Sequence, residues 1–156
     1  MRANAEASPA HDRAEARLAF EVLAVRRAAA RRSPSQAEAL SDAARSFGAS
    51  GADAARSPEG DLDPADAEAC FRRCLADAAR TPFLLESLEL LAEPSPMQPL
   101  AHRAAAYQRI AAAVRAADPD TAEVAVREMH EEERRLRRAA VLRRLPMLGV
   151  SGRSND

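Results

Sequence analysis

Alanine restricts this chain to helical folds more strongly than any other feature of its sequence. It accounts for 39 of the 156 residues, and alanine is the best helix former among the amino acids. Aromatic residues make up only 3% of the chain, and no segment alternates apolar and polar residues with the β-branched side chains typical of strands. The sequence therefore predicts an all-α fold, and its length predicts one domain with a single core.

Prolines and small polar residues divide the chain into about six segments with helical periodicity. Asp63-Pro64, Thr81-Pro82 and Asp118-Pro119 each place a polar residue before a proline, which is typical of a helix start. Short connections between such helices describe an antiparallel bundle. The apolar spacing predicts helices over about 12–32, 35–48, 64–79, 82–91, 100–117 and 119–144.

The expected boundaries depend on caps and breaks. Ser35 and Glu38 have the spacing of a capping box, and Gly48 is expected to end that second helix. The segment 48–61 is rich in glycine and small polar residues and predicts a loop. We expect disordered ends at 1–11 and 145–156, with the folded domain over 12–144.

Charge and hydropathy exclude several classes of protein. The formal net charge is −1, which gives no support to nucleic-acid binding, because proteins that bind duplex DNA usually present a clearly basic face. No apolar run approaches the roughly 18 residues that cross a bilayer, and the N-terminus lacks the apolar core of a secretory signal. The two cysteines indicate no disulfide framework, so we expect a reducing cytoplasm. No acid/base pair, nucleophile set or phosphate-binding glycine loop indicates an enzyme.

The last two predicted helices and the middle of the chain carry the residues of a known family. The stretch YQRIAAAVRAADPDTAEVAVREMH, 107–130, matches the family pattern at Ile110, Ala113, Val114, Asp118 and Ala122. The stretch CFRRCLADAARTPFLLESLELL, 70–91, agrees through Phe71, Leu75, Pro82 and Leu84. Over about 15–144 the chain resembles the FCD domain, the effector-binding and dimerisation domain of GntR-type transcription regulators in the FadR-like branch.

Many FCD domains bind a divalent metal through one acidic residue and three histidines, and this chain departs from that pattern. The acid is retained as Glu68, but the histidine positions fall on Arg72, Tyr107 and Met129, with His130 one residue further. Arginine cannot ligate a metal, and tyrosine or methionine is a poor substitute in a site that prefers imidazole and carboxylate. The resemblance therefore implies a domain without the family's metal and without a cofactor.

Glu68 and Arg72 lie four residues apart on one helix, so they can form an ion pair on a shared face. We hypothesise that Arg72 replaces the positive charge of the metal and binds a small carboxylate through two hydrogen bonds, while Tyr107 donates another. The alternative is a surface ion pair next to an ordinary packing tyrosine. The ligand-binding residues expected from the resemblance are Glu68, Arg72, Tyr107, Met129, His130 and Arg26, the last of which could match an arginine of the family's opening helix.

Two other patterns have more ordinary explanations. A zinc ion could in principle be held by Cys70, Cys74, His102 and His130, or a cysteine could act as a nucleophile with a histidine base. The histidines are far apart in the sequence, however, and nothing in the sequence places them near the cysteines. A small cysteine on an apolar helix face is more common. The arginine cluster at 134–144 could contact DNA or an acidic partner, but glutamates precede it, so a solvated helix face is the simpler interpretation.

The resemblance also sets the expected partners. Regulators of this family carry a winged helix-turn-helix before the FCD domain, whereas only 1–11 precede the first predicted helix here. We therefore expect no DNA binding by this chain. It is expected to be either a free-standing domain or a truncated reading of a longer regulator. The expected partners are a small effector, with a carboxylate favoured, and a second copy or a full-length regulator as dimer partner. The alternative is a degenerate bundle that serves only as a protein–protein interaction module.

Overall fold

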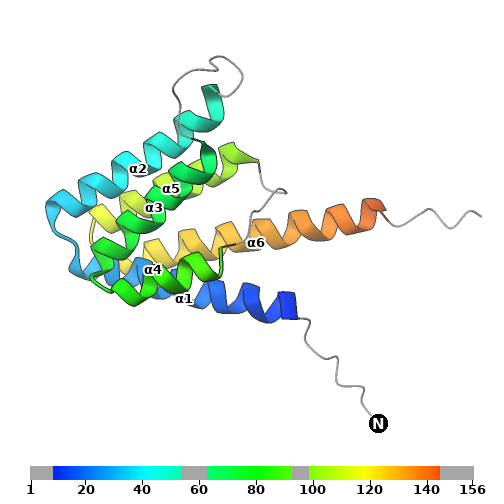
Figure 1. The fold of residues 1–156 in the computed structure, drawn as a ribbon, viewed down its shortest axis with the longest axis horizontal. Coiled ribbons are helices and arrows are strands. Elements are labelled where there is room, and N and C mark those ends of the chain that lie inside the picture. Colours follow the sequence, from blue (N-terminus) through cyan, green and yellow to red (C-terminus); the bar gives the residue numbers. More distant parts are fainter. Residues whose placement is uncertain (1–8, 54–62, 93–98, 145–156) are drawn as a thin grey trace, which may run out of the picture.

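The computed structural model describes residues 9–53, 63–92 and 99–144, which form a bundle of six helices (Figure 1). These described ranges contain no strand, so the prediction of an all-α bundle of about six helices is confirmed. None of the described helices has both the length and the apolar character needed to cross a membrane. In chain order the helices are α1 (Pro9–Arg31), α2 (Pro34–Asp53), α3 (Pro64–Ala79), α4 (Pro82–Leu90), α5 (Leu100–Arg115) and α6 (Pro119–Arg144).

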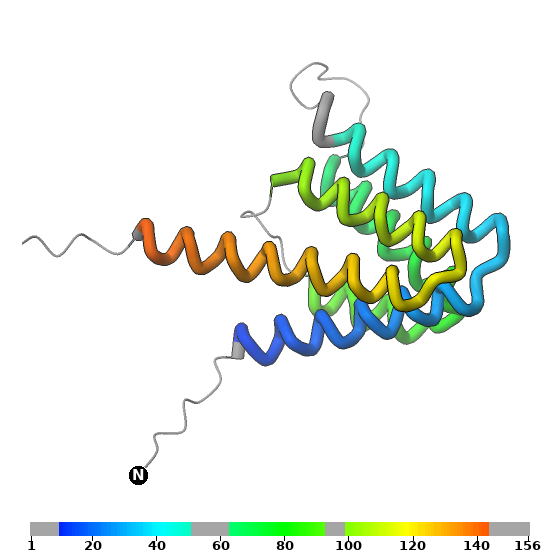
Figure 2. Tube along the Cα trace, turned by 180° about the vertical axis from the view of Figure 1, so that it is seen from behind, coloured from blue at the N-terminus to red at the C-terminus, as the bar shows by residue number. Residues whose placement is uncertain are grey.

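The helices pack around α1 and α5. α1 contacts α3, α4, α5 and α6, and α2 packs on α3 and α5. α1 and α6 are antiparallel, because Arg26 near the end of α1 contacts Asp120 at the start of α6, whereas Arg17 contacts Glu133. Figures 1 and 2 show that the C-terminal part of α6 extends past α1 and α5. The apolar core therefore includes residues of the first half of α6 only, from Ala122 to Met129.

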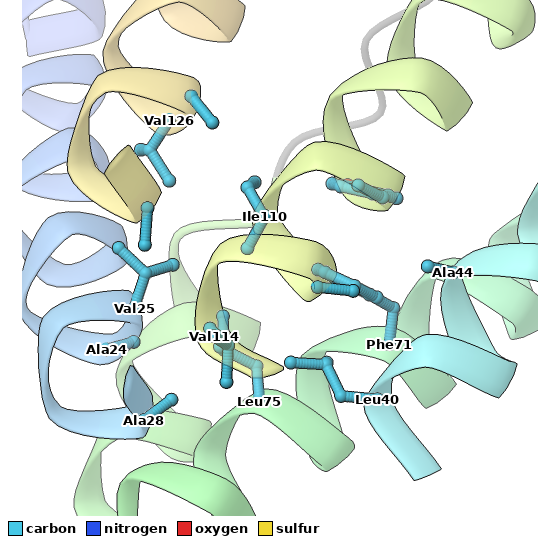
Figure 3. Close-up of a cluster of buried hydrophobic side chains, with 14 of the residues drawn as sticks. Ala24, Val25, Ala28, Leu40, Ala44, Phe71, Leu75, Ile110, Val114 and Val126 are labelled. Carbon is cyan, nitrogen blue, oxygen red and sulfur yellow. The ribbon is translucent and has the colours of Figure 1, made fainter. Parts of the chain in front are cut away.

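The core combines many alanines with a few large apolar side chains. Apolar side chains from five helices pack together in the centre of the bundle (Figure 3): Val25, Leu40, Phe71, Ile110 and Val126. Alanine is the most frequent buried residue in the described part of the chain. Because its side chain is a single methyl group, the helix backbones approach closely where alanines face one another.

The second helix is longer than the sequence predicted. We expected Gly48 to end it, but α2 continues to Asp53, so 48–53 are helical and not a loop; 54–61 lie outside the described residues. A Cβ atom on Gly48 would lie 3.3 Å from Nε2 of Gln108 and 3.7 Å from Cβ of Ala104, both on α5. The glycine therefore marks a close approach of two helices, which a sequence pattern cannot distinguish from a helix end.

The cap of α2 is also two residues earlier than predicted. The backbone N–H of Gln36 donates to Oγ of Ser33 at 3.2 Å, and the N–H of Ser33 donates to Oε1 of Gln36 at 2.9 Å. This reciprocal pair is a capping box. The prediction of Ser35 and Glu38 was wrong because two overlapping serine patterns compete in this stretch, and Pro34 starts the helix at the earlier one.

Replacing Ser33 with alanine is expected to lower the free energy of unfolding by about 1 kcal/mol, because the N–H of Gln36 loses its acceptor. Ser35→Ala is the matched control, since the Ser35 hydroxyl bonds to Oγ of Ser33 and not to a helix N–H. Urea denaturation followed by circular dichroism measures both variants. Equal losses for the two serines would contradict the assignment of Ser33 as the cap.

The other helix starts agree with the sequence, whereas some ends differ. α3, α4 and α6 begin at Pro64, Pro82 and Pro119 as predicted, and Asp118 Oδ1 accepts from the N–H of Thr121 at 2.9 Å. α1 begins at Pro9 and not at Asp12, so 9–11 of the expected tail are helical. α5 ends at Arg115, before a left-handed Ala117 with φ of 60° turns the chain into α6. The expected tails at 1–8 and 145–156 lie outside the described residues.

Candidate functional site

Glu68 lies at the centre of a buried polar cluster that joins α3 and α5. Its Oε1 accepts a hydrogen bond from the hydroxyl of Tyr107 at 2.8 Å and lies 3.0 Å from Nη1 of Arg72. Its Oε2 contacts Nη2 of Arg103. Only 13% of the Glu68 side chain and 8% of the Arg103 side chain are exposed. Three of the expected site residues, Glu68, Arg72 and Tyr107, are therefore joined through one carboxylate.

Aromatic rings support this cluster from the core. Phe71 stacks on Tyr107 with centroids 4.2 Å apart, and the ring of Phe47 meets Tyr107 edge-on at 5.0 Å. The guanidinium carbon of Arg103 lies 5.4 Å from the centroid of Phe47, within the range of a cation–π contact. Burial, together with the negative charge of Glu68, raises the pKa of Tyr107. The hydroxyl therefore stays protonated and acts as a donor.

The cluster carries more positive than negative charge. Two guanidiniums, on Arg72 and Arg103, face the single carboxylate of Glu68, which leaves one formal positive charge. Nε of Arg72 is buried and has no hydrogen-bond acceptor among the described residues, whereas Nη2 of Arg103 is paired with Oε2 of Glu68. A buried donor without an acceptor is uncommon, and Nε of Arg72 lies where an anion would gain both charge and a hydrogen bond.

Sequence reasoning missed Arg103. The residue lies in an alanine-rich stretch, four positions before Tyr107, so the helical repeat places both on one face of α5. That spacing was the available signal. It was not decisive, because exposed arginines occur at the same spacing throughout this sequence, and burial distinguishes Arg103 only after the helices pack.

A second buried network contains His130 and lies between α1 and α6. Nε2 of His130 is 2.7 Å from Oε2 of Glu21, whose Oε1 accepts a hydrogen bond from Arg17 at 2.9 Å. Burial disfavours a charged Glu21, but the hydrogen bond from His130 and the charge of Arg17 outweigh it and lower its pKa to about 2. The charge of Glu21 also acts on Tyr107, so the two networks are neighbours.

A small pocket opens beside the second network. Arg17, His130 and Glu133 form part of its wall, and Leu18 and Leu91 add apolar surface. Its volume is about 40 Å³, enough for one or two water molecules. Glu68, Arg72, Tyr107 and Met129 do not line it. Of the expected site residues, His130 thus lies in the wall of this neighbouring pocket.

The two remaining expected residues lie in the apolar core and at the surface. Met129 is 5% exposed and belongs to the apolar core that also contains Tyr107. Nη1 of Arg26 lies 2.7 Å from Oδ1 of Asp120 and 2.7 Å from Oε2 of Glu123, in an ion pair at the surface between α1 and α6. Arg26 therefore bridges α1 and α6 at the surface and pairs with residues outside both buried networks.

The model of the FCD domain matches residues 12–132, which include both buried networks from Arg17 to His130. The chain belongs to the FCD domain family. FCD domains are effector-binding regulatory domains of the GntR family, which is a family of regulators and not of enzymes. No curated protein and no solved structure matches the chain.

The residues at the metal position of this FCD domain do not fit a metal ion. Glu68 supplies the carboxylate, and its two oxygens face the guanidiniums of Arg72 and Arg103 and the hydroxyl of Tyr107. A cation placed there would meet two fixed positive charges and would compete with three donors. Within the described ranges no group of three or more His, Cys, Asp or Glu side chains is placed to hold a metal ion.

The cysteines of the FCD domain lie next to this cluster on α3. Both are partly exposed and reduced. Burial, together with the neighbouring Cys70, raises the pKa of Cys74 to about 11. At neutral pH its thiol is therefore protonated, which makes it a poor nucleophile and a poor metal ligand.

Proposed function

We propose that this FCD domain senses a small organic anion, with a carboxylate as the favoured group, at the Glu68 cluster and without a metal ion. The observation that carries the proposal is the surplus of charge: two buried guanidiniums face one carboxylate, and the buried Nε of Arg72 lacks an acceptor among the described residues. We place this activity in the cytoplasm, in a regulator and not in an enzyme.

A carboxylate that enters the cluster accepts a hydrogen bond from Nε of Arg72 and is attracted by the positive charge of Arg103. Charge-assisted hydrogen bonds of this kind are among the strongest in proteins, and the planar guanidinium suits a carboxylate. Arg72 belongs to α3 and Arg103 to α5, so binding ties these two helices together. α5 also packs on α2 and α6, so a ligand that fixes α3 against α5 also restricts the motion of these neighbouring helices.

A second candidate function is that of a protein–protein interaction module, either in a homodimer or with a full-length regulator. The observation that favours it is the exposure of large apolar side chains, with Phe83 63% exposed and Leu90 73% exposed. This function would use the outer surface and would leave the buried charges of the Glu68 cluster without a role.

A thermal-shift screen with small mono- and dicarboxylates, with and without EDTA, separates the two functions. We expect at least one carboxylate to raise the melting temperature equally in both conditions, because no metal takes part. Arg72→Met is expected to weaken that ligand by about 10- to 100-fold, which corresponds to the loss of a charged hydrogen bond. Isothermal titration calorimetry measures the dissociation constants.

Arg109→Met is the matched control, since Arg109 lies on α5 but pairs with Glu128 at the surface. It is expected to leave ligand affinity unchanged. Arg103→Lys keeps the charge in the core while changing the donor geometry, so it reports on Arg103 with less risk to folding. Unchanged binding in both Arg72→Met and Arg103→Lys would overturn the site. A protein that responds to no carboxylate would favour the interaction module.

A further inference from the structure

The C-terminal part of α6 presents a basic and apolar surface outside the bundle. Residues 134–143 contain five arginines and no acidic residue; Arg134, Arg135 and Arg137 pair with the preceding glutamates 131–133, and Arg138 and Arg143 add further positive charge. Val141 is 61% exposed and Leu142 is 68% exposed, although an apolar residue at a helix surface gains from burial. Figures 1 and 2 show this segment extending beyond α1 and α5. We name residues 134–143 the α6 arm.

The outer side of α4 presents the opposite combination of charge and apolar surface. Phe83, Glu86 and Leu90 follow one another at spacings of three and four, so they form one stripe along the helix. Phe83 is 63% exposed and Leu90 is 73% exposed, and Glu86 and Glu89 are exposed between them. α4 contains no basic residue. We name this surface the α4 stripe.

Neighbouring residues of α1 extend the apolar part of the α4 stripe. The ring of Phe20 meets Phe83 edge-on with centroids 6.4 Å apart, and Leu23, one turn further along α1, is 40% exposed. The guanidiniums at the two ends of α4 are engaged there, because Arg27 donates to Oγ1 of Thr81 and Arg13 donates to the carbonyl of Leu90. The exposed charge of the stripe itself is therefore negative.

We propose that the α6 arm of one copy of this chain docks on the α4 stripe of a second copy. Each surface has what the other needs: arginines face glutamates, while Val141 and Leu142 of the arm cover Phe83 and Leu90 of the stripe. Complementary charges at the rim of an apolar contact set partner and orientation, and burial of the apolar side chains supplies affinity. This inference specifies the dimer partner named above and does not depend on effector binding.

A twofold axis makes the contact reciprocal. If the arm of the first copy lies on the stripe of the second, symmetry places the arm of the second on the stripe of the first. Each dimer then contains two identical arm–stripe contacts, so a single substitution acts twice. The closed arrangement uses both surfaces and leaves neither free to build a filament.

Sedimentation velocity of the full chain over a range of concentrations tests the proposal. We expect a concentration-dependent dimer, and Leu142→Asp and Phe83→Asp are each expected to weaken it by at least about thirtyfold, because each removes an apolar contact twice. Val124→Asp is the matched control, since Val124 is 52% exposed on the opposite end of α6. It is expected to leave the dimer unchanged.

A charge exchange tests the pairing itself. Arg138→Glu is expected to weaken the dimer by about tenfold, and Glu86→Arg in the same chain is expected to restore it, because the exchanged charges again attract. Circular dichroism checks that each variant keeps its helix content. A monomer at all concentrations overturns the proposal, and so does a dimer that either Leu142→Asp or Phe83→Asp leaves intact. In the last case dimerisation stands but uses another surface, and the carboxylate-induced thermal shift remains an independent result.

Discussion

Phe47→Ala is expected to lower the free energy of unfolding by about 3–5 kcal/mol, the range for removing a large aromatic side chain from a packed core. Phe47 is a residue of α2 and is 1% exposed. Its ring packs against the Glu68 cluster, where it contacts both Tyr107 and the guanidinium of Arg103. The substitution leaves a cavity next to buried charges, and it also removes the ring that supports Arg103. Urea denaturation measured at neutral pH gives the change.

Val124→Ala is the matched control for Phe47→Ala. Val124 is 52% exposed on α6, so its replacement is expected to change the free energy of unfolding by less than about 0.5 kcal/mol. A loss of less than about 1 kcal/mol in Phe47→Ala would show that the ring is not packed as described. It would also remove the support assigned to Arg103 and weaken the case for the Glu68 cluster as a preformed site.

Glu21→Gln is expected to make the protein less stable at neutral pH and to flatten its response to acid. The pKa of Glu21 falls from an ordinary value of 4.5 to about 2 in the folded protein, so the folded state favours the charged carboxylate. The resulting stability is complete above the unfolded pKa and is lost as the pH falls from about 5 to about 2. This difference corresponds to about 3 kcal/mol.

Chemical denaturation at a series of pH values measures this contribution. The wild-type protein should lose about 3 kcal/mol on acidification, whereas Glu21→Gln should lack that component of the loss. Glu15→Gln is the control, because Glu15 lies on α1 but its side chain is 67% exposed beside His11. Parallel pH profiles for the wild-type protein and Glu21→Gln would contradict the buried network of Arg17, Glu21 and His130.

Local features of the sequence predicted the helices well. Starts at Pro64, Pro82 and Pro119 follow from residues that cap a helix or begin it, and these act within one turn of the chain. The predictions failed where two helices meet. Gly48 has the local properties of a helix end but lies inside α2, because α5 approaches it closely. The cap at Ser33 was missed because the neighbouring serines offer similar local bonds.

The site shows the same division between local and tertiary information. The family pattern identifies Glu68 as the acid and aligns Arg72 with a histidine position, and one helical turn is enough to pair them. Their connection to Tyr107, and the position of Arg103 beside them, depend on how α3 and α5 pack. Arg26, which the resemblance also indicated, instead forms ion pairs with Asp120 and Glu123. Both residues lie far from Arg26 in the sequence, so no local pattern predicts the contact.

The sequence by itself determined that this protein is a helical bundle of the FCD type and that the histidine positions of a metal site hold other residues. The helices follow from composition, periodicity and caps, all of which act between near neighbours in the chain, whereas the FCD type and the histidine positions follow from the resemblance to that family. Only the tertiary structure decided that Arg72 and Arg103 are buried against one carboxylate, and that the α6 arm lies outside the core. Side chains become buried when helices that are distant in the sequence pack together and exclude water. No local sequence pattern specifies which charged side chains will lie in such a contact.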